Sequence, residues 1–312
     1  MQEGRIINLN GGVYKVELAD GSIISVRARG KLRSEKKEVV NDKSLSKKAS
    51  MTTIKNSPKV GDVVVVDNDM IDHYLPRKNE MIRPDIANVD QILLVFAAKE
   101  PDFSYYLLDL FLVNILKQKI EPLIVISKID KLASDEFISL KNSMNYYVNL
   151  GYRVLYVNSL TGEGIENVKN ALIGKVTVLS GQTVDGKSTL INSIYPEFSL
   201  KTNEISYALG RGKHTTREIN LYPFLENGYI GDTPGFSKLD LLGVSTDELD
   251  SLFIEFKEYF CKFKDCKHTK NTKGCGVIEA VNNGEILKSR YESYLRMLEL
   301  KGERKWRYHY LF

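Results

Sequence analysis

The alternation of apolar and polar residues divides the chain into three regions, and the first is typical of β-structure. In residues 1–30, apolar side chains alternate with polar ones on both sides of Asn10-Gly11-Gly12 and Asp20-Gly21. Asn-Gly and Asp-Gly accept the positive φ of tight turns, so the pattern predicts short strands joined as hairpins. Residues 31–59 carry many lysines and few large apolar groups, which predicts a long basic loop before a closing strand at residues 63–66. Short strands with one long polar loop are typical of a small β-barrel, of which the OB-like barrel commonly binds nucleic acid.

From about residue 91, short apolar runs alternate with longer amphipathic stretches. The apolar runs are residues 92–98, 123–126, 154–157 and 176–179, and the amphipathic stretches are residues 105–117, 135–150 and 165–172. Short apolar runs between helical stretches are typical of buried parallel strands. The alternation predicts an α/β domain with a parallel, doubly wound sheet.

After Gly243 the strand-like runs end and helical spacing takes over. Ser245 and Glu248 have the spacing of a capping box, and five apolar residues follow at helical intervals, namely Leu249, Leu252, Phe253, Phe256 and Phe260. A further helix is predicted at residues 285–300. We therefore predict an OB-like barrel at residues 1–70, an α/β domain at residues 71–240 and a mostly helical domain at residues 241–312.

Composition narrows the class of protein. With 312 residues, of which 43% are hydrophobic and 27% charged, the chain is expected to form two or three globular domains. No apolar run approaches the roughly 18–20 residues that cross a bilayer. The first thirty residues carry no export signal. We therefore exclude membrane and secreted proteins and expect a monomer in the cytoplasm.

Charge is distributed unevenly along the chain. Residues 1–61 carry 13 Lys and Arg against 6 Asp and Glu, residues 257–312 carry 13 against 7, and the acidic middle carries 18 against 27. Basic ends of this kind favour a polyanionic partner, most often nucleic acid. Two ordinary lysine-rich surfaces are the alternative interpretation.

The most specific motif is a phosphate-binding loop. The segment is Gly181-Gln182-Thr183-Val184-Asp185-Gly186-Lys187-Ser188, which matches G-x-x-x-x-G-K-[S/T] between a predicted strand and a helix at residues 188–194. In this arrangement backbone N–H groups and the helix N-terminus face the phosphates. Lys187 would neutralise the β- and γ-phosphate oxygens, and the Ser188 hydroxyl would coordinate Mg²⁺. A carboxylate at Asp185 is expected to reduce nucleotide affinity.

Three further motifs are typical of GTPases. Asp232-Thr-Pro-Gly235 looks like the D-x-x-G element, in which Asp232 would hold Mg²⁺ through water and the Gly235 N–H would sense the γ-phosphate. Ser127-Lys128-Ile129-Asp130 resembles the guanine-reading N-K-x-D motif, with Ser in place of Asn. Asp130 would accept two hydrogen bonds that adenine cannot supply. Asn158-Ser159-Leu160 resembles the S-A-x loop, whose backbone N–H contacts the guanine O6.

The order of these motifs differs from the ordinary one. Common GTPases run from the phosphate-binding loop through a switch threonine and D-x-x-G to N-K-x-D and S-A-x, whereas here the last two come first. This order predicts a circularly permuted GTPase, which is feasible because the termini of a domain often lie close together. The permutation also places the D-x-x-G segment directly before the C-terminal region.

All three cysteines lie within residues 261–275. An odd, clustered set in a chain without an export signal argues against a disulfide framework. The spacing Cys261-x4-Cys266-x-His268-x6-Cys275 offers three thiolates and one imidazole, which suit a closed tetrahedral Zn²⁺ site. Three buried thiols without a metal are the alternative.

Four segments, together with the permuted order, resemble one family closely. They are Leu75-Pro-Arg-Lys-Asn79, Arg83-Pro-Asp-Ile-Ala-Asn-Val-Asp90, Lys99-Glu-Pro-Asp-Phe103 and Gly210-Arg-Gly-Lys-His-Thr-Thr-Arg217. Over essentially the whole chain the sequence is similar to the RsgA (YjeQ or YloQ) family of bacterial GTPases that depend on the small ribosomal subunit. The resemblance implies an OB domain, a permuted GTPase domain and a zinc domain. It also implies that the chain binds the small subunit and its rRNA late in maturation, hydrolyses GTP to GDP and phosphate under stimulation by the subunit, and is then released.

The resemblance also assigns roles to residues. Residues 213–217 match the family's switch I, in which Thr216, or alternatively Thr215, would bind Mg²⁺ together with Ser188. His214 would be a catalytic or rRNA-responsive residue, unless it is simply a solvated loop histidine. Phe236 stands where many GTPases carry a water-orienting glutamine, so slow intrinsic turnover is expected. The candidate nucleotide-binding residues are Ser127, Lys128, Ile129, Asp130, Asn158, Ser159, Leu160, Gly181, Gln182, Thr183, Val184, Asp185, Gly186, Lys187, Ser188, Thr189, Asp232 and Gly235. Residues that would contact rRNA phosphates are Lys31, Arg33, Lys36, Lys37, Lys43, Lys47 and Lys48.

Two other functions stay open. An rRNA-binding assembly factor with a degenerate, non-catalytic nucleotide site would explain Ser127, Val184 and Asp185. A P-loop ATPase or kinase would need a preference for adenine, which Asp130 argues against.

Overall fold

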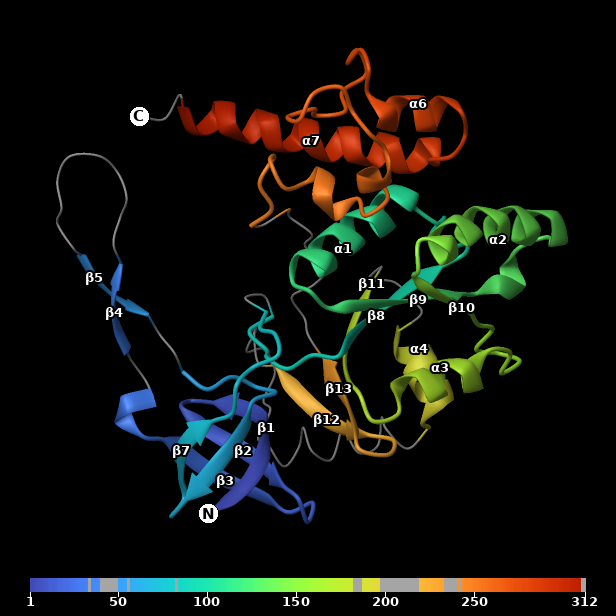
Figure 1. Ribbon diagram of the computed structural model, residues 1–312. Helices are drawn as coiled ribbons and strands as arrows, with labels where there is room; N and C mark the ends of the chain where they lie inside the picture. The colour runs from blue at the N-terminus through green and yellow to red at the C-terminus, as the bar shows by residue number, and fades with distance from the viewer. Residues whose placement is uncertain are drawn as a thin grey trace. The chain divides into compact units, whose positions relative to one another are not determined.

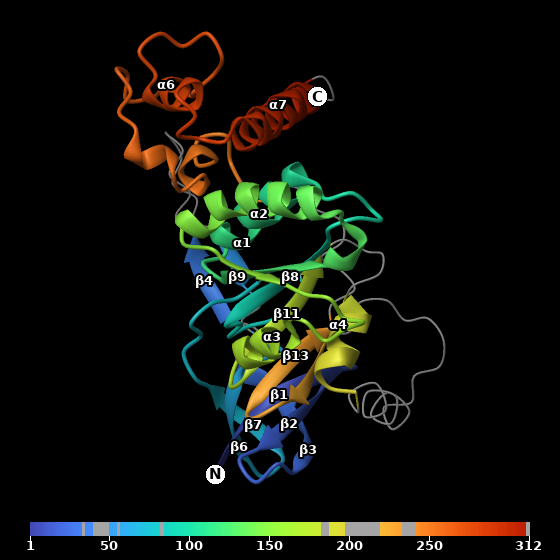
Figure 2. The ribbon, with the colours of Figure 1, turned by 90° about the vertical axis from the view of Figure 1, so that its right-hand side faces the viewer.

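The described chain forms two compact units. The computed structural model describes residues 1–32, 35–39, 50–54, 57–81, 84–181, 187–196, 219–232, 241 and 243–309. The first unit consists of Met1–Val89, Gly174–Val178 and Ser206–Gly235, and the second of Asp90–Ile173, Leu179–Ile205 and Phe236–Phe312. Figures 1 and 2 show the elements of both units. The division into three domains at residues 70 and 240 stays a prediction.

The first unit contains a closed five-stranded barrel. The five strands are β1 (Gln2–Asn10), β2 (Val13–Leu18), β3 (Ile23–Ala28), β6 (Val63–Asp67) and β7 (Met70–Tyr74). They pair in the order β1-β2-β3-β7-β6 and back to β1, and every pair is antiparallel except β3 with β7. Gly11, Gly12 and Gly21 have the positive φ that the predicted turns require. The OB-like barrel expected from the sequence is thus confirmed.

The prediction of one long loop over residues 31–59 is wrong in part. A short 3₁₀ turn, η1 (Gly30–Leu32), precedes two strands, β4 (Glu35–Val39) and β5 (Ser50–Ile54), which pair antiparallel with Glu35 opposite Ile54. A strand ladder is held by backbone groups, so two polar strands can pair without the apolar alternation that revealed the barrel. The candidate phosphate contacts Arg33, Lys43, Lys47 and Lys48 lie outside the described residues.

A hairpin extends the first unit beyond the barrel. β12 (Asn220–Phe224) and β13 (Gly228–Asp232) pair antiparallel, and Asn220 of β12 lies opposite Asn8 of β1. The first half of β11 (Val176–Gly181) runs parallel to β13, with Val176 opposite Tyr229. Asp232, the first residue of the D-x-x-G segment, is the last residue of β13.

A buried ion pair fixes the chain where it leaves the barrel. Arg77 Nε and Nη2 donate to the two carboxylate oxygens of Asp62, each at 2.8 Å. Asp62 is fully buried, and Nη1 of Arg77 also donates to Glu80 at 2.6 Å. Burial by itself would lower the pKa of Arg77, but its hydrogen bonds to Asp62 and the Asp62 charge raise that pKa well above its usual range. Arg77 therefore has a structural role within one of the four family-like segments.

Replacing Arg77 with alanine is expected to destabilise the first unit by about 3–5 kcal/mol, because the Asp62 carboxylate would stay buried without a cation. The measurement is the urea midpoint of the chain. The matched control is Asp85→Asn, which removes an exposed partner of Lys59 and should cost less than about 1 kcal/mol. An Arg77→Ala midpoint equal to that of the parent chain would rule out this role.

The second unit is built on parallel strands with helices on both faces. β8 (Gln91–Ala97), β9 (Glu121–Ser127) and β10 (Arg153–Tyr156) pair in parallel in the order β10-β9-β8. α1 (Tyr105–Lys117) and α2 (Ser134–Asn149) cover one face, and α3 (Ile165–Leu172) and α4 (Lys187–Ile194) lie on the other (Figures 1 and 2). Every residue of β8 is buried, as expected for a continuous apolar run. The predicted doubly wound α/β arrangement is confirmed.

The C-terminal region belongs to the second unit and departs from prediction at one point. In place of the helix expected from Ser245 to Phe260 there are two 3₁₀ turns, η3 (Asp250–Leu252) and η4 (Phe256–Glu258). The Ser245 N–H does bond to Glu248, at 2.6 Å, but the backbone leaves helical geometry at Phe253. The next residues turn Glu255 inward to pair with a buried arginine, while Phe260 is 98% exposed instead of lying on an apolar face.

Two helices complete this region: α6 (Gly276–Asn282) and α7 (Lys288–His309). Tyr291, Tyr294 and Leu295 of α7 are buried, as their helical spacing predicts. Among all described helices, none is both long and apolar enough to span a bilayer.

Candidate functional site

Three of the nucleotide motifs follow the ends of strands in the second unit. Ser127 is the last residue of β9, Asn158 follows β10, and Gly181 ends β11. Gly181 has φ +121°, and a Cβ on it would lie 2.1 Å from the backbone oxygen of Val95 in β8, so only glycine fits there. The carboxyl ends of parallel strands share one edge of a sheet, and ligands of α/β proteins bind outside that edge.

Asp130 and Asn158 line the same hollow. It has a volume of about 180 Å³, and its other lining residues are Ile129, Leu132, Ser134, Phe137 and Glu163. No other described residue gives the Asp130 side chain a hydrogen bond or an ion pair, so its carboxylate is available to a ligand. Ile129 and Asp130 are held in the short 3₁₀ turn η2 (Ile129–Lys131), which follows Lys128 with its positive φ of 57°.

The loop after β10 is organised by Asn158. Its side-chain Oδ1 accepts the backbone N–H groups of Leu160 at 3.0 Å and Thr161 at 3.3 Å, and its own N–H donates to Glu163 O at 3.0 Å. Of the amides of residues 158–160, only that of Ser159 has no acceptor among the described residues. It is therefore the loop amide that a ligand can use.

The first two residues of the N-K-x-D-like motif are held away from the hollow. Ser127 is buried, and its hydroxyl donates to Phe96 O in β8 at 3.2 Å. Lys128 Nζ donates to Glu100 O at 2.8 Å, and the Glu100 carboxylate pairs with Lys131. Ser127 thus makes a strand-to-strand contact in the position where N-K-x-D motifs carry an asparagine.

The helix that follows the phosphate-binding loop lies beside the Asn158 loop. Lys187 begins α4, and its ammonium donates to Gly181 O at 3.3 Å across the ends of the loop. Burial lowers the pKa of Lys187 below its usual range, and bound phosphates would act in the opposite direction. Ser193 of α4 contacts Ser159 O at 3.5 Å, while Ser188 and Thr189 are exposed in the first turn. The structure therefore connects Lys187, through α4 and one loop, to the hollow lined by Asp130.

The remaining candidate residues cannot be placed beside this edge. Asp232 belongs to the first unit. The others lie outside the described residues: Gln182, Thr183, Val184, Asp185, Gly186, His214, Thr215, Thr216, Gly235 and Phe236.

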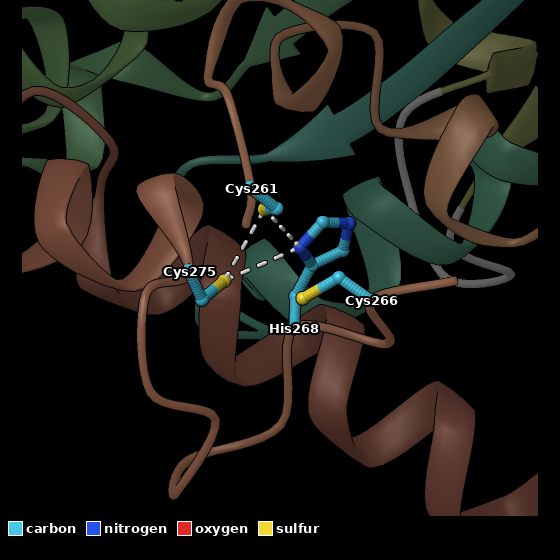
Figure 3. Close-up of side chains that lie close together, drawn as sticks. All are labelled: Cys261, Cys266, His268 and Cys275. Carbon is cyan, nitrogen blue, oxygen red and sulfur yellow. Dashed lines mark hydrogen bonds between the residues drawn. The ribbon is translucent and has the colours of Figure 1, made fainter. Parts of the chain in front are cut away.

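The four candidate metal ligands converge in the C-terminal region. The Sγ atoms of Cys261, Cys266 and Cys275 and a ring nitrogen of His268 all lie within 4.8 Å of one another (Figure 3). Cys261 Sγ is 3.7 Å from Cys275 Sγ, and His268 Nδ1 is 3.5 Å and 3.4 Å from these two sulfurs. Burial raises the pKa of the Cys275 thiol to about 12 and lowers the pKa of His268. This group could hold a metal ion.

Residues around the group fix its backbone. Tyr291 and Tyr294 of α7 donate their hydroxyls to the carbonyl oxygens of His268 at 2.7 Å and Lys267 at 2.9 Å. Gly276 lies where a Cβ would come within 2.3 Å of Phe260 O. Helical spacing identified the two tyrosines only as core residues, because a hydroxyl bond to a distant carbonyl leaves no pattern in the sequence. Leu132, Ser134, Phe137 and Glu163, which also line the hollow, were not predicted, because they belong to no motif in the sequence.

Comparison with known proteins identifies the family. Residues 74–242 match the model of the RsgA GTPase family. The Small ribosomal subunit biogenesis GTPase RsgA of Phytoplasma australiense is 42% identical to this chain, over 98% of both sequences. The protein of the same name from Halalkalibacterium halodurans is also 42% identical, over 99% of this chain and 100% of its own length. The chain belongs to the RsgA GTPase family.

Solved structures agree with this membership in the RsgA family. YjeQ from Thermotoga maritima superposes with a TM-score of 0.78 at 33% identity, covering 96% of this chain and 98% of its own. YloQ, a circularly permuted GTPase, gives a TM-score of 0.74 at 32% identity, covering 97% and 96%. The permuted order expected from the motifs is confirmed.

Proposed function

We propose that the chain hydrolyses GTP to GDP and phosphate during late maturation of the small ribosomal subunit, that the subunit stimulates this hydrolysis, and that hydrolysis releases the chain. The observation that carries the proposal is the Asp130 carboxylate, which faces a hollow and has no bond to any other described residue. Two further findings support the proposal: the chain belongs to the RsgA GTPase family, and its relatives are named as GTPases of small ribosomal subunit biogenesis. The proposal includes a monomer that works in the cytoplasm.

Guanine recognition rests on two groups in this proposal. Asp130 accepts hydrogen bonds from N1–H and the 2-amino group, which adenine cannot offer together. The Ser159 N–H donates to O6, since the neighbouring amides are already bonded. Ser127 contributes nothing to the base, because its hydroxyl is committed to Phe96. Asp130 therefore retains the selectivity for guanine, while the affinity for the nucleotide is lower than with an asparagine that contacts the base.

Phosphate recognition rests on the start of α4. Lys187 and the exposed Ser188 hydroxyl stand at the helix N-terminus, where anions and their metal counter-ions bind. The Mg²⁺ that accompanies GTP would supply positive charge against the phosphates when bound. We assign Ser188 and Thr216 as its protein ligands and Asp232 as a ligand through water. His214 is the candidate catalytic residue, and Gly235 the γ-phosphate sensor.

The Cys261, Cys266, His268 and Cys275 group is proposed to hold one structural Zn²⁺. Tetrahedral Zn²⁺ with bonds of about 2.3 Å to sulfur and about 2.0 Å to nitrogen separates two sulfurs by about 3.8 Å and sulfur from nitrogen by about 3.5 Å. The observed separations are 3.7 Å between the sulfurs of Cys261 and Cys275, and 3.5 and 3.4 Å from these sulfurs to His268 Nδ1. The Asp250 carboxylate lies 4.0 Å from the other ring nitrogen, too far for a hydrogen bond but close enough to favour positive charge at this group. With four protein ligands no open position is left for chemistry.

An rRNA partner is favoured by the surface around this group. Five exposed lysines, Lys257, Lys262, Lys264, Lys270 and Lys273, lie in one short segment with the exposed rings of Phe260 and Phe263. Lysines supply affinity for phosphates, and exposed aromatic rings stack on unpaired bases. Both the lysine-rich N-terminal segment and this surface would then contact rRNA.

The test is phosphate release from Mg²⁺·GTP with and without purified small subunits at low salt. Slow release by the chain alone and a many-fold increase on adding subunits are expected, because Phe236 stands where many GTPases carry a water-orienting glutamine. Fluorescent GDP and ADP binding are measured in parallel. Absence of GDP binding would favour an rRNA-binding factor with a degenerate site, and a preference for ADP would favour an ATPase or kinase.

A further inference from the structure

A buried ion cluster joins the C-terminal region to α1 within the second unit. Arg290 of α7 is fully buried, and its Nη1 donates to Asp109 Oδ1 at 2.7 Å. Its Nε donates to Glu255 Oε1 at 2.6 Å. Asp109 lies in α1, whereas Glu255 precedes η4. One guanidinium therefore links a helix of the nucleotide-binding part to the region that carries the metal group.

Aromatic side chains enclose the cluster. From α2, Tyr147 donates its hydroxyl to Asp109 at 2.8 Å, and Tyr146 donates to Glu255 at 3.3 Å. The Arg290 guanidinium lies 4.7 Å from the ring centre of Phe253. The cluster thus contacts α1, α2, α7 and the segment between the two 3₁₀ turns.

The cluster is not fully satisfied. Two buried carboxylates share one guanidinium, and Asp109 Oδ2 is buried with no hydrogen-bond partner among the described residues. Buried ion pairs of this kind add little net stability compared with apolar residues of similar volume. An unpaired polar atom is costly in a low-dielectric interior, so the free energy of this network depends strongly on how its members are arranged.

α1 extends from this cluster to the base-reading loop. The helix begins after Ser104, directly after the segment that contains Glu100. Glu100 O accepts the Lys128 ammonium at 2.8 Å, and the Glu100 carboxylate pairs with Lys131. A shift of α1 at Asp109 therefore moves the partner of the two lysines that flank Asp130.

α7 is also attached to the segment that follows the D-x-x-G motif. Lys301 donates its ammonium to Leu241 O, and Leu241 is buried among residues of α1 and the C-terminal core. α7 thus contacts both α1 and the segment that follows the D-x-x-G motif. Coupling between distant sites is carried by packed side chains, hydrogen-bond networks and rigid elements, and these contacts form one continuous chain of that kind.

We propose that the Arg290–Asp109–Glu255 cluster transmits engagement of the small subunit by the metal-binding region to the nucleotide site. This rests on the function proposed above. Arg290 is a positioning residue for the stimulated reaction: it acts through Asp109 and α1 on the loop that carries Asp130, and it touches neither nucleotide nor metal.

Two variants test the proposal in the full-length chain. Arg290→Lys keeps the charge but loses the rigid fork in which Nε, Nη1 and Nη2 bond to the two carboxylates at once. The triple variant Asp109→Leu/Glu255→Leu/Arg290→Met removes all three charges, so no carboxylate is left buried alone. Both are expected to keep basal GTP hydrolysis within about twofold of the parent, while stimulation by small subunits falls about 5- to 150-fold, the range typical of a coupling between two sites. The control is Lys288→Ala, which changes an exposed residue of the same helix.

A second readout separates this proposal from the function on which it rests. Coupling is reciprocal, so Mg²⁺·GDP should slow amide hydrogen exchange in α6 of the parent chain and leave it unchanged in the triple variant. A folded triple variant that keeps either full stimulation or the exchange response overturns the proposal. If the parent chain binds GDP and shows the exchange response but is not stimulated by subunits, the proposed function is overturned. The coupling through the Arg290–Asp109–Glu255 cluster would still stand.

Discussion

Replacing Asp130 with asparagine is expected to weaken GTP binding by about 100-fold or more and to let XTP bind in its place. In the proposed site, guanine would donate two hydrogen bonds, from N1–H and the 2-amino group, to the Asp130 carboxylate. Each hydrogen bond to a charged group is worth about 1.5–3 kcal/mol, and about 1.4 kcal/mol corresponds to a factor of ten in affinity. Asparagine offers one acceptor and one donor, which suit the N1–H and the C2 carbonyl of xanthine. Competition of GDP and XDP against a fluorescent nucleotide measures the change.

Glu163→Gln is the control for this variant, because Glu163 carries the other carboxylate that lines the same hollow. It should leave the ratio of GDP to XDP affinity within about threefold, since a rim group in water contributes little. If Asp130→Asn leaves nucleotide selectivity unchanged, Asp130 does not read the base. Adenine preference in the parent chain would then point to a P-loop ATPase or kinase.

Local patterns predicted most of the architecture because each element carries its own signal. The positive φ of Gly11, Gly12 and Gly21 is required by turns that the sequence marks. β8 is an uninterrupted apolar run, and both Tyr105–Lys117 and Ile165–Leu172 have the bounds that apolar spacing indicates. Motif order identified the permutation, because it depends only on the sequence of motifs along the chain.

The two errors arose where tertiary pairing overrides local pattern. β4 and β5 pair through backbone groups, and their polar side chains gave no alternation to detect. The helix expected from Ser245 to Phe260 has correct apolar spacing, yet Glu255 is pulled inward by Arg290. Arg290 lies outside residues 245–260, so the pattern of those residues alone could not reveal this contact.

In the candidate site too, residues close together in the sequence were predictable and contacts between separate elements were not. The candidate metal ligands were predictable because three thiols and one imidazole fall within a short segment, and their side chains converge in the structure. The orientation of Ser127 toward Phe96 and the Arg290 cluster were not, because each joins residues from separate elements with no fixed spacing. Sequence reasoning finds chemistry that is local in the chain, and the structure adds the groups that hold it in place.

Removing the proposed Zn²⁺ is expected to unfold the region around residues 261–282 while nucleotide binding persists. Backbone structure there is sparse: a bridge between Cys261 and Cys275 and the seven-residue α6. Structural Zn²⁺ contributes about 10–16 kcal/mol to the folding of small zinc-binding peptides, so its loss exceeds what this short segment can replace. Chelation followed by hydrogen exchange of α6 measures the effect, and elemental analysis gives the zinc content. Exchange should rise to the rate of an unprotected chain, while GDP affinity stays within about threefold, because Asp130 and Lys187 do not contact the metal group.

Cys275→Ser should reproduce the effect of chelation, because it removes a buried ligand without changing the length of the loop. Lys273→Ala, an exposed change in the same loop, should retain one zinc per chain and the exchange rates of the parent. After the metal is lost, α7 should keep its helix. It should lose the hydrogen bonds that Tyr291 and Tyr294 donate to the carbonyl oxygens of His268 and Lys267. A parent chain that contains no zinc and whose α6 is equally protected with and without chelator would show that the thiols are held by packing alone.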